Sequence, residues 1–127
     1  MSPRWLVDGL NVIGSRPDGW WRDRTGAMRE LVATLRRLAE EGGDEVAVVL
    51  DGCPRELGEP GRVEVLFAPR PGPNAADAVI AERVEADAAP AALCVVTSDR
   101  ALADRVTTAG AQVMGAGAFR RLLEKAG

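Results

Sequence analysis

Four acidic side chains of this chain lie where carboxylates could share a site. Three of them come at the end of an apolar run typical of a buried strand, or within two residues of it, and the fourth falls in the first turn of a predicted helix. They are Asp8, Asp51, Asp99 and Asp77. Because ligands bind beyond the carboxyl ends of parallel strands, we expect these four carboxylates to converge at one edge of a sheet.

The donor types at this edge indicate a hard metal ion. Clustered carboxylates repel one another, and burial raises their pKa values, so a divalent cation would stabilise the cluster. Ligation by oxygen alone suits Mg²⁺ or Mn²⁺, which polarise phosphoryl oxygens and lower the pKa of bound water. The 127-residue chain has no histidine, which excludes Ser-His-Asp and Cys-His nucleophiles and histidine general bases. Metal-bound water is then the best nucleophile this sequence can offer.

Each acid also has a purely structural interpretation, which the sequence leaves open. Short polar side chains are typical of turns and helix N-caps, where they hydrogen-bond nearby backbone. Asp8 with Asn11, and Asp51 with Gly52, would be turn residues. Asn74 with Asp77, and Ser98 with Asp99, would cap helices. A single shared site explains all four at once. Asp44, Asp87 and Asp104 are interpreted as solvated.

Strand-like and helical segments alternate along the chain. The apolar runs predict five strands, at 4–8, 46–50, 63–67, 93–97 and 111–114. Helical spacing predicts helices from an N-cap at Thr25 to Gly42-Gly43, from about Asn74, from Ser98 to Gly110, and over about 118–125. This alternation predicts an α/β fold: a three-layer α/β/α sandwich around a mainly parallel, about five-stranded sheet. The connection at 52–62 has no helical pattern, and 63–67 is expected to be an edge strand.

Composition bounds the class of protein. A length of 127 residues predicts one domain, residues 1–127. No apolar run approaches ~18 residues and no secretory signal begins the chain, so we expect neither a membrane span nor export, and a cytoplasmic location. Two cysteines are too few for a metal cage or a disulfide framework. The net charge of −3 and pI near 5.0 differ from those of a strongly basic nucleic-acid-binding protein.

One segment nevertheless has an excess of positive charge. Residues 16–37 contain six arginines against three acids, together with a tryptophan pair. Arginines can hold phosphates and tryptophans can stack on unpaired bases, although a solvated helix face and packing over the core are the ordinary alternatives. The candidate RNA-binding residues here are Arg22, Arg24, Arg29, Trp20 and Trp21.

The quoted motifs resemble those of a known family. LVDGLNVIG is similar to the opening strand and DGxN signature of NYN domains, a branch of the PIN-like nucleases, and VVLDG resembles their second strand. The segment RVEVLFAPRPGPNAADAVIAERVE is similar to their strand, loop and acidic helix, and VVTSDRALADRVTTAGAQVMGAGAFRRLL to their closing TSD motif. The resemblance runs nearly end to end and is strongest to the small stand-alone bacterial YacP-like proteins.

This resemblance implies a PIN-like fold and a metal-dependent endoribonuclease. It implies metal-binding roles for Asp8, Asp77 and Asp99, a substrate- or Asp8-orienting role for Asn11, and supporting roles for Ser98 and Asp51. It also implies Mg²⁺ or Mn²⁺ as the cofactor and RNA as the substrate. It suggests mRNA as that substrate and the ribosome as a partner. Two other hypotheses remain: a non-catalytic RNA- or ribosome-binding module of the same fold, and a small-molecule phosphatase. Phosphatases with an aspartyl nucleophile need DxD after the first strand, where this chain has DGLN.

Overall fold

The computed structural model describes residues 4–15, 19–68 and 75–126. Five strands are present, namely β1 (Arg4–Asp8), β2 (Glu45–Asp51), β3 (Glu64–Ala68), β4 (Leu93–Val96) and β5 (Gln112–Met114). Five α-helices accompany them: α1 (Gly9–Gly14), α2 (Arg24–Gly42), α3 (Ala75–Ala86), α4 (Arg100–Thr108) and α5 (Ala116–Ala126). Two short 3₁₀ helices are η1 (Trp20–Arg22) and η2 (Pro90–Ala92). All five predicted strands are therefore confirmed, with ends that differ by at most one residue.

The strands form one parallel sheet in the order β3-β2-β1-β4-β5. The central strand β1 pairs with β2 on one side and β4 on the other, and β3 is an edge strand, as its alternating pattern predicted. Because all the strands run in one direction, their carboxyl ends share one edge of the sheet. The strand order also places the end of β1 next to the end of β4.

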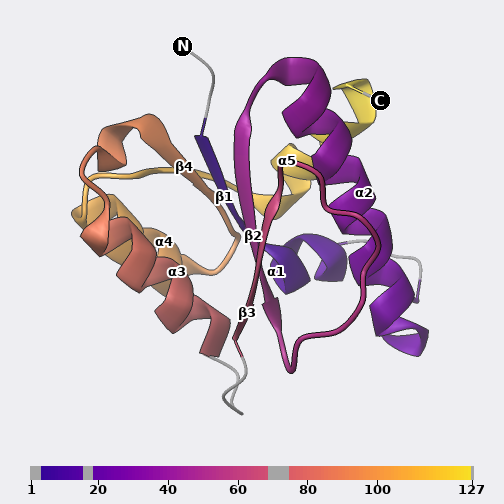
Figure 1. Cartoon of the computed structure of the whole chain (residues 1–127). Helices are drawn as coiled ribbons and strands as arrows, with labels where there is room; N and C mark the ends of the chain where they lie inside the picture. Colours follow the sequence, from indigo (N-terminus) through magenta and orange to yellow (C-terminus); the bar gives the residue numbers. More distant parts are fainter. Residues whose placement is uncertain (1–3, 16–18, 69–74, 127) are drawn as a thin grey trace.

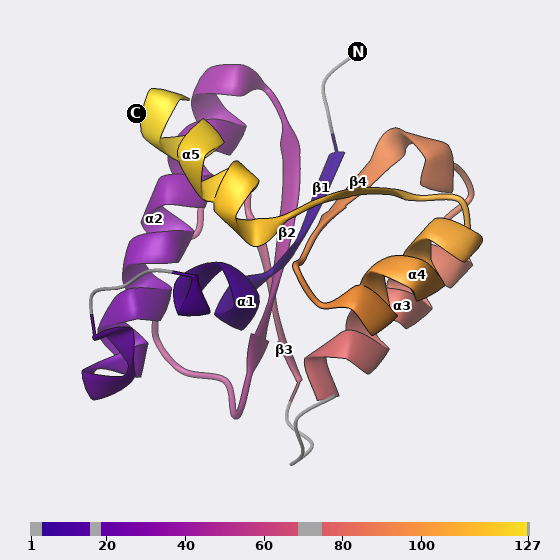
Figure 2. The same cartoon turned by 180° about the vertical axis from the view of Figure 1, so that it is seen from behind.

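Helices cover both faces of the sheet, which confirms the predicted three-layer architecture. α1, α2 and α5 lie on one side and α3 and α4 on the other (Figures 1 and 2). Each side has its own core. Trp5, Leu35 and Phe119 belong to the first core, and Ile80 and Val106 to the second. β1 is buried from both faces, as expected for the central strand of such a sheet.

The first helix follows β1 without a loop and was not predicted. The sequence analysis interpreted the region after Asp8 as polar loop, whereas α1 begins at Gly9 and buries Val12 and Ile13 under α2 and α5. Its six residues are too few for the periodicity on which helix prediction rests. The expected N-cap of α2 was also wrong: Asp23, not Thr25, caps it by accepting a hydrogen bond from the N–H of Gly26.

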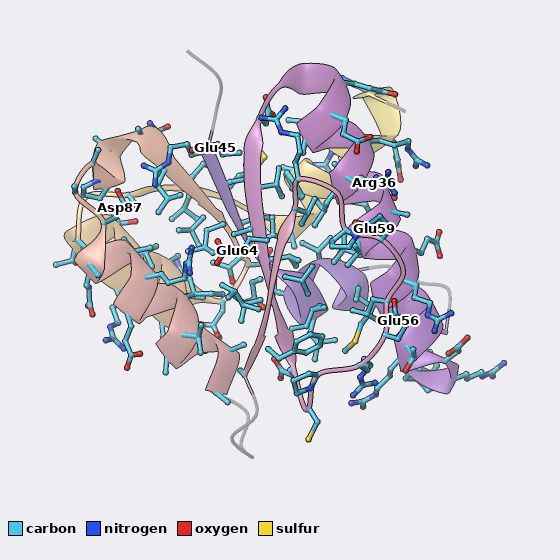
Figure 3. The ribbon with its side chains drawn as sticks, viewed as in Figure 1. Arg36, Glu45, Glu56, Glu59, Glu64 and Asp87 are labelled. Atoms are coloured by element: carbon cyan, nitrogen blue, oxygen red, sulfur yellow. The ribbon has the colours of Figure 1, made fainter. Side chains whose placement is uncertain are left out.

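Charged side chains at the amino end of the sheet are structural. Arg4 pairs with Asp87 and Glu45, and Arg83 pairs with Glu64 on β3 (Figure 3). Asp44 was expected to be solvated but is 7% exposed and accepts a hydrogen bond of 2.8 Å from the indole N–H of Trp5. In the part of the chain that the structure describes, no helix has the length and apolar character needed to cross a bilayer.

Gly9 allows α1 to start directly against the sheet. A Cβ atom added to Gly9 would lie 2.9 Å from the carbonyl oxygen of Val49 and closer still to the side chain of Leu50. The backbone oxygen cannot move without disturbing β2, so only glycine fits between Asp8 and the rest of α1. The glycine of the DGxN signature therefore has a packing function that sets the direction of the chain after Asp8.

We predict that Gly9→Ala destabilises the protein by about 1–3 kcal/mol, because the new methyl group overpacks the contact with β2. Gly117→Ala is the matched control, since a Cβ at Gly117 on α5 meets only an ordinary contact at 3.6 Å from Arg121. Urea unfolding of both variants measures the difference. Equal stability of the two variants would contradict the packing role of Gly9.

Candidate functional site

The neighbouring ends of β1 and β4 place Asp8 at the centre of the candidate site. Asp8 is the last residue of β1 and is 5% exposed. Residues 97–99 follow β4 directly and turn toward α4. Asp51 ends β2, the strand on the other side of β1, and Asp77 lies in the first turn of α3.

The four carboxylates influence one another electrostatically, which shows that they converge. Burial, assisted by the negative charges of Asp77 and Asp51, raises the pKa of Asp8 to about 6, against opposing contributions from the hydroxyl of Thr97 and the backbone N–H of Asn11. Burial, then Asp99 and Asp51, raise the pKa of Asp77. Burial also raises the pKa of Asp51, although Arg24 opposes the rise. Asp77 therefore lies within electrostatic reach of the other three acids, while a single site shared by all four stays a prediction.

Thr97 links the carboxylates across the two central strands. Its hydroxyl donates to Oδ2 of Asp8 at 3.0 Å and accepts the backbone N–H of Asp99 at 3.1 Å. The side chain is 1% exposed, and its bond to Asp8 is buried whereas its bond to Asp99 is partly buried. One hydroxyl thus orients the buried carboxylate and fixes the backbone that carries a second one.

Asn11 and Ser98 tie the same loop to two helices. Oδ1 of Asn11 accepts the backbone N–H of Ser98 at 2.7 Å. The Oγ of Ser98 accepts the N–H of Ala116 at 2.9 Å and so satisfies one of the free donors at the start of α5. Asn11 and Ser98, both predicted site residues, therefore hold the loop between β4 and α4 in place. The expectation that Ser98 caps α4 was wrong.

Asp99 is the residue that caps α4. Its Oδ1 accepts the N–H of Leu102 at 3.0 Å, so the capping interpretation holds for that oxygen. Asp8, by contrast, makes no side-chain capping bond to α1. The proposed capping pair of Asn74 with Asp77 cannot be placed, because Asn74 lies outside the described residues.

The donor chemistry of these residues fits a hard divalent cation, although the side chains are not closed around one. Within residues 4–15, 19–68 and 75–126, no group of three or more acidic, histidine or cysteine side chains is arranged to hold a metal ion. The carboxylates supply only oxygen donors, which suit such a cation, and burial is the main cause of the raised pKa values of Asp8 and Asp77.

The candidate RNA-binding residues have different surroundings. Arg24, at the start of α2, lies close enough to Asp51 to lower its pKa, and Arg22 is exposed on η1. Arg29 donates to the carbonyl oxygen of Glu56 through Nε and Nη2, so its guanidinium is already engaged. Trp21 is 57% exposed, which argues against packing over the core. The side chain of Trp20 lies outside the described part of the chain.

Sequence reasoning did not single out Thr97 as a site residue. It was assigned to the end of a strand, where a β-branched residue is ordinary. The available signal was its position two residues before Asp99, since a threonine hydroxyl commonly accepts the N–H two residues along the chain. Its bond to Asp8, 89 residues away, depends on the strand order and is not visible in the sequence.

Comparisons with known proteins place these features in a family context. The family profile described as the YacP-like NYN domain matches residues 5–127. The crystal structure of Rae1 (YacP) from Bacillus subtilis superposes with a TM-score of 0.78 at 27% identity, covering 99% of this chain and 75% of that one. A mutant of the same protein gives a TM-score of 0.73 at 26% identity, with 97% and 75% covered. No curated protein matches the sequence.

We predict that Asp8→Asn stabilises the metal-free protein at high pH. The folded-state pKa of Asp8 is about 6 and its ordinary value is 3.8, so the folded state binds the proton more tightly and wild-type stability falls as pH rises between these values. Asparagine does not titrate and removes this penalty, which amounts to up to about 3 kcal/mol above pH 6. Urea unfolding in EDTA at about pH 5 and about pH 8 measures the change.

Asp104→Asn on the exposed side of α4 is the control for that experiment; because it keeps Asp8, it should follow the stability of the wild type at both pH values. An Asp8→Asn variant that is no more stable than the wild type at the higher pH would contradict the buried-charge penalty.

We predict that Thr97→Val costs about 1–3 kcal/mol of stability, because it leaves the buried carboxylate of Asp8 and the partly buried N–H of Asp99 without their partner. The same variant should raise the pKa of Asp8 further, seen as a steeper loss of stability with rising pH. Thr97→Ser keeps the hydroxyl and should restore both properties. If Val and Ser variants behave alike, the hydroxyl does not have this role.

Proposed function

Because the chain belongs to the YacP-like NYN domain family, we propose that it is an endoribonuclease that requires Mg²⁺ or Mn²⁺ and hydrolyses RNA phosphodiester bonds. The observation that carries the proposal is the convergence of Asp8, Asp51, Asp77 and Asp99 at the carboxyl edge of the sheet. Family membership suggests a nuclease, and the acids supply the groups that such chemistry needs in a chain without histidine.

In this proposal Asp8, Asp77 and Asp99 hold the cation, which when bound stabilises negative charge developing on the phosphate and activates water. Asp51 lies at the periphery of the cluster beside Arg24 and contributes charge there. Thr97 orients Asp8 and fixes the backbone of Asp99, while Asn11 and Ser98 hold the connecting loop. These contacts keep the carboxylates in place when substrate arrives.

The absence of histidine favours water over the ribose 2′-hydroxyl as the nucleophile, since the chain has no histidine to act as the general base for that hydroxyl. Attack by water forms a new P–O bond and breaks the bond to the 3′-oxygen, which takes up a proton. The products are then a 5′-phosphate and a free 3′-hydroxyl. The resemblance to YacP-like proteins extends the proposal to mRNA as the substrate and the ribosome as a partner.

The alternative is a non-catalytic RNA- or ribosome-binding module of the same fold. The carboxylate cluster argues against it, because a binding surface for a polyanion gains nothing from acids such as Asp8, Asp51 and Asp77, whose pKa values are raised by burial. Such a module would bind RNA without turnover and would not need Asp77. A phosphatase using the same edge would turn over a simple phosphomonoester.

We predict that Mn²⁺ binds the wild-type protein, that Asp8→Asn/Asp99→Asn abolishes this binding, and that only the wild type cuts RNA. Asparagine caps helices as well as aspartate does, so the change at Asp99 preserves the start of α4. Calorimetric titration with Mn²⁺ and incubation with end-labelled RNA, each with and without ribosomes, are the measurements. Mapping the new ends should give a 5′-phosphate.

Asp104→Asn is again the control and should bind Mn²⁺ and cut as the wild type does. Equal, negligible Mn²⁺ binding by wild type and double variant, together with no cleavage in any condition, would overturn the nuclease proposal. Retained RNA binding under those conditions would favour the binding module.

A further inference from the structure

The connection between β2 and β3 is fastened along α2 by arginines. Arg29 donates to the carbonyl oxygen of Glu56, and Arg36 donates to that of Glu59 at 3.3 Å and to the carboxylate of Glu40 (Figure 3). Leu57 anchors the connection in the core at 7% exposure. This segment was predicted to lack helix, but its attachment to α2 was not foreseen. Its side chains are therefore held in defined positions beside the site.

Arg55, in the same connection, lies over the turn that follows Asp51. Its Nη2 is 3.1 Å from the position that a Cβ atom on Gly52 would occupy, so its guanidinium covers the residue that follows Asp51. Gly52 has a φ of +98° and its N–H donates to the carbonyl oxygen of Ala68, which fixes this turn. The Nη1 of Arg55 donates to the hydroxyl of Thr25, the second residue of α2, at 3.0 Å.

The charge of Arg55 is not compensated by an acid. Among the described residues, Arg4, Arg36, Arg83 and Arg105 pair with carboxylates, whereas Arg55 makes no ion pair and is held by a neutral hydroxyl. Arg24, the neighbour of Thr25, also directs positive charge toward Asp51. Both arginines are exposed. The edge therefore carries exposed positive charge on the β2 side of the acids, with Arg55 held by Thr25.

We propose that Arg55, together with Arg24, binds a backbone phosphate of single-stranded RNA on the β2 side of the carboxylate cluster. This inference rests on the proposed function, because it supplies the positive charge that brings a polyanion to an acidic edge. A guanidinium that already uses one N–H on Thr25 keeps other donors for phosphate oxygens. A phosphate contact does not read the base sequence of the RNA. It sets only the register of the RNA chain over the site.

The test compares Arg55→Gln with a control variant, Arg36→Gln. Arg36 lies on α2 about 18 Å further along the helix than Arg24, and it also contacts the connection between β2 and β3. The probe is a fluorescent single-stranded oligoribonucleotide, measured by anisotropy in EDTA from about 50 to about 250 mM KCl. Arg55→Gln should weaken binding about 5- to 10-fold. The slope of the logarithm of the binding constant against the logarithm of the salt concentration should also fall in magnitude by about 0.7, the value for one phosphate contact. Arg36→Gln should leave both unchanged.

Arg55→Lys separates charge from structural support, because it keeps the positive charge and loses the planar fork. It should recover most of the salt slope, and urea unfolding of all three variants records any general loss of stability. Wild-type salt dependence in Arg55→Gln, equal loss in Arg36→Gln, or no measurable RNA binding by the wild type would each overturn the inference.

Because binding is measured without divalent cations, this result is independent of cleavage. If the wild type binds RNA through Arg55 but never cuts it, the phosphate contact stands and the nuclease proposal fails. If the wild type cuts RNA and Arg55→Gln both binds and cuts equally well, the nuclease proposal stands and the role of Arg55 fails.

Discussion

A buried carboxylate at the end of the central strand is the constraint on which the rest of the site depends. Asp8 is 5% exposed, and burial raises its pKa to about 6 even though the hydroxyl of Thr97 stabilises the charged form. A turn at this point would be served as well by an uncharged asparagine, without the cost of burying a charge. The carboxylate is therefore better explained by an interaction that needs its charge than by the local backbone.

The fold holds this costly arrangement through contacts between segments that are distant in sequence. Thr97 joins the end of β1 to the start of α4, and Ser98 joins the same loop to α5. Gly9 lets the chain leave Asp8 directly into a helix packed against β2. The bonds of Thr97 therefore couple the positions of Asp8 and Asp99, and Gly9 sets the position of Asp8 against β2.

The sequence was informative where local pattern and global topology coincide. The apolar runs that end at Asp8 and Asp51 marked buried parallel strands, and parallel strands necessarily bring their carboxyl ends together. Features that depend on tertiary contacts were not predictable in this way. The hydroxyl bond from Thr97 to Asp8 spans 89 residues, α1 is too short to show periodicity, and Ser98 caps a helix that starts 18 residues later. Capping and turn preferences identify a residue type, whereas strand order decides which partner it meets.

Charge also limits how RNA can approach this edge. The chain has a net charge of −3 and its central site consists of acids, so long-range attraction of a polyanion is weak. Five arginines that could offset this are engaged: Arg29 and Arg36 fasten the connection between β2 and β3 to α2, and Arg4, Arg83 and Arg105 pair with acids. In the proposed function, affinity for RNA would then come from the cations placed beside the acids or from a second surface that already holds the RNA. A protein built in this way gains selectivity from positioning, because RNA that is not held in register finds mainly repulsion at the carboxylates.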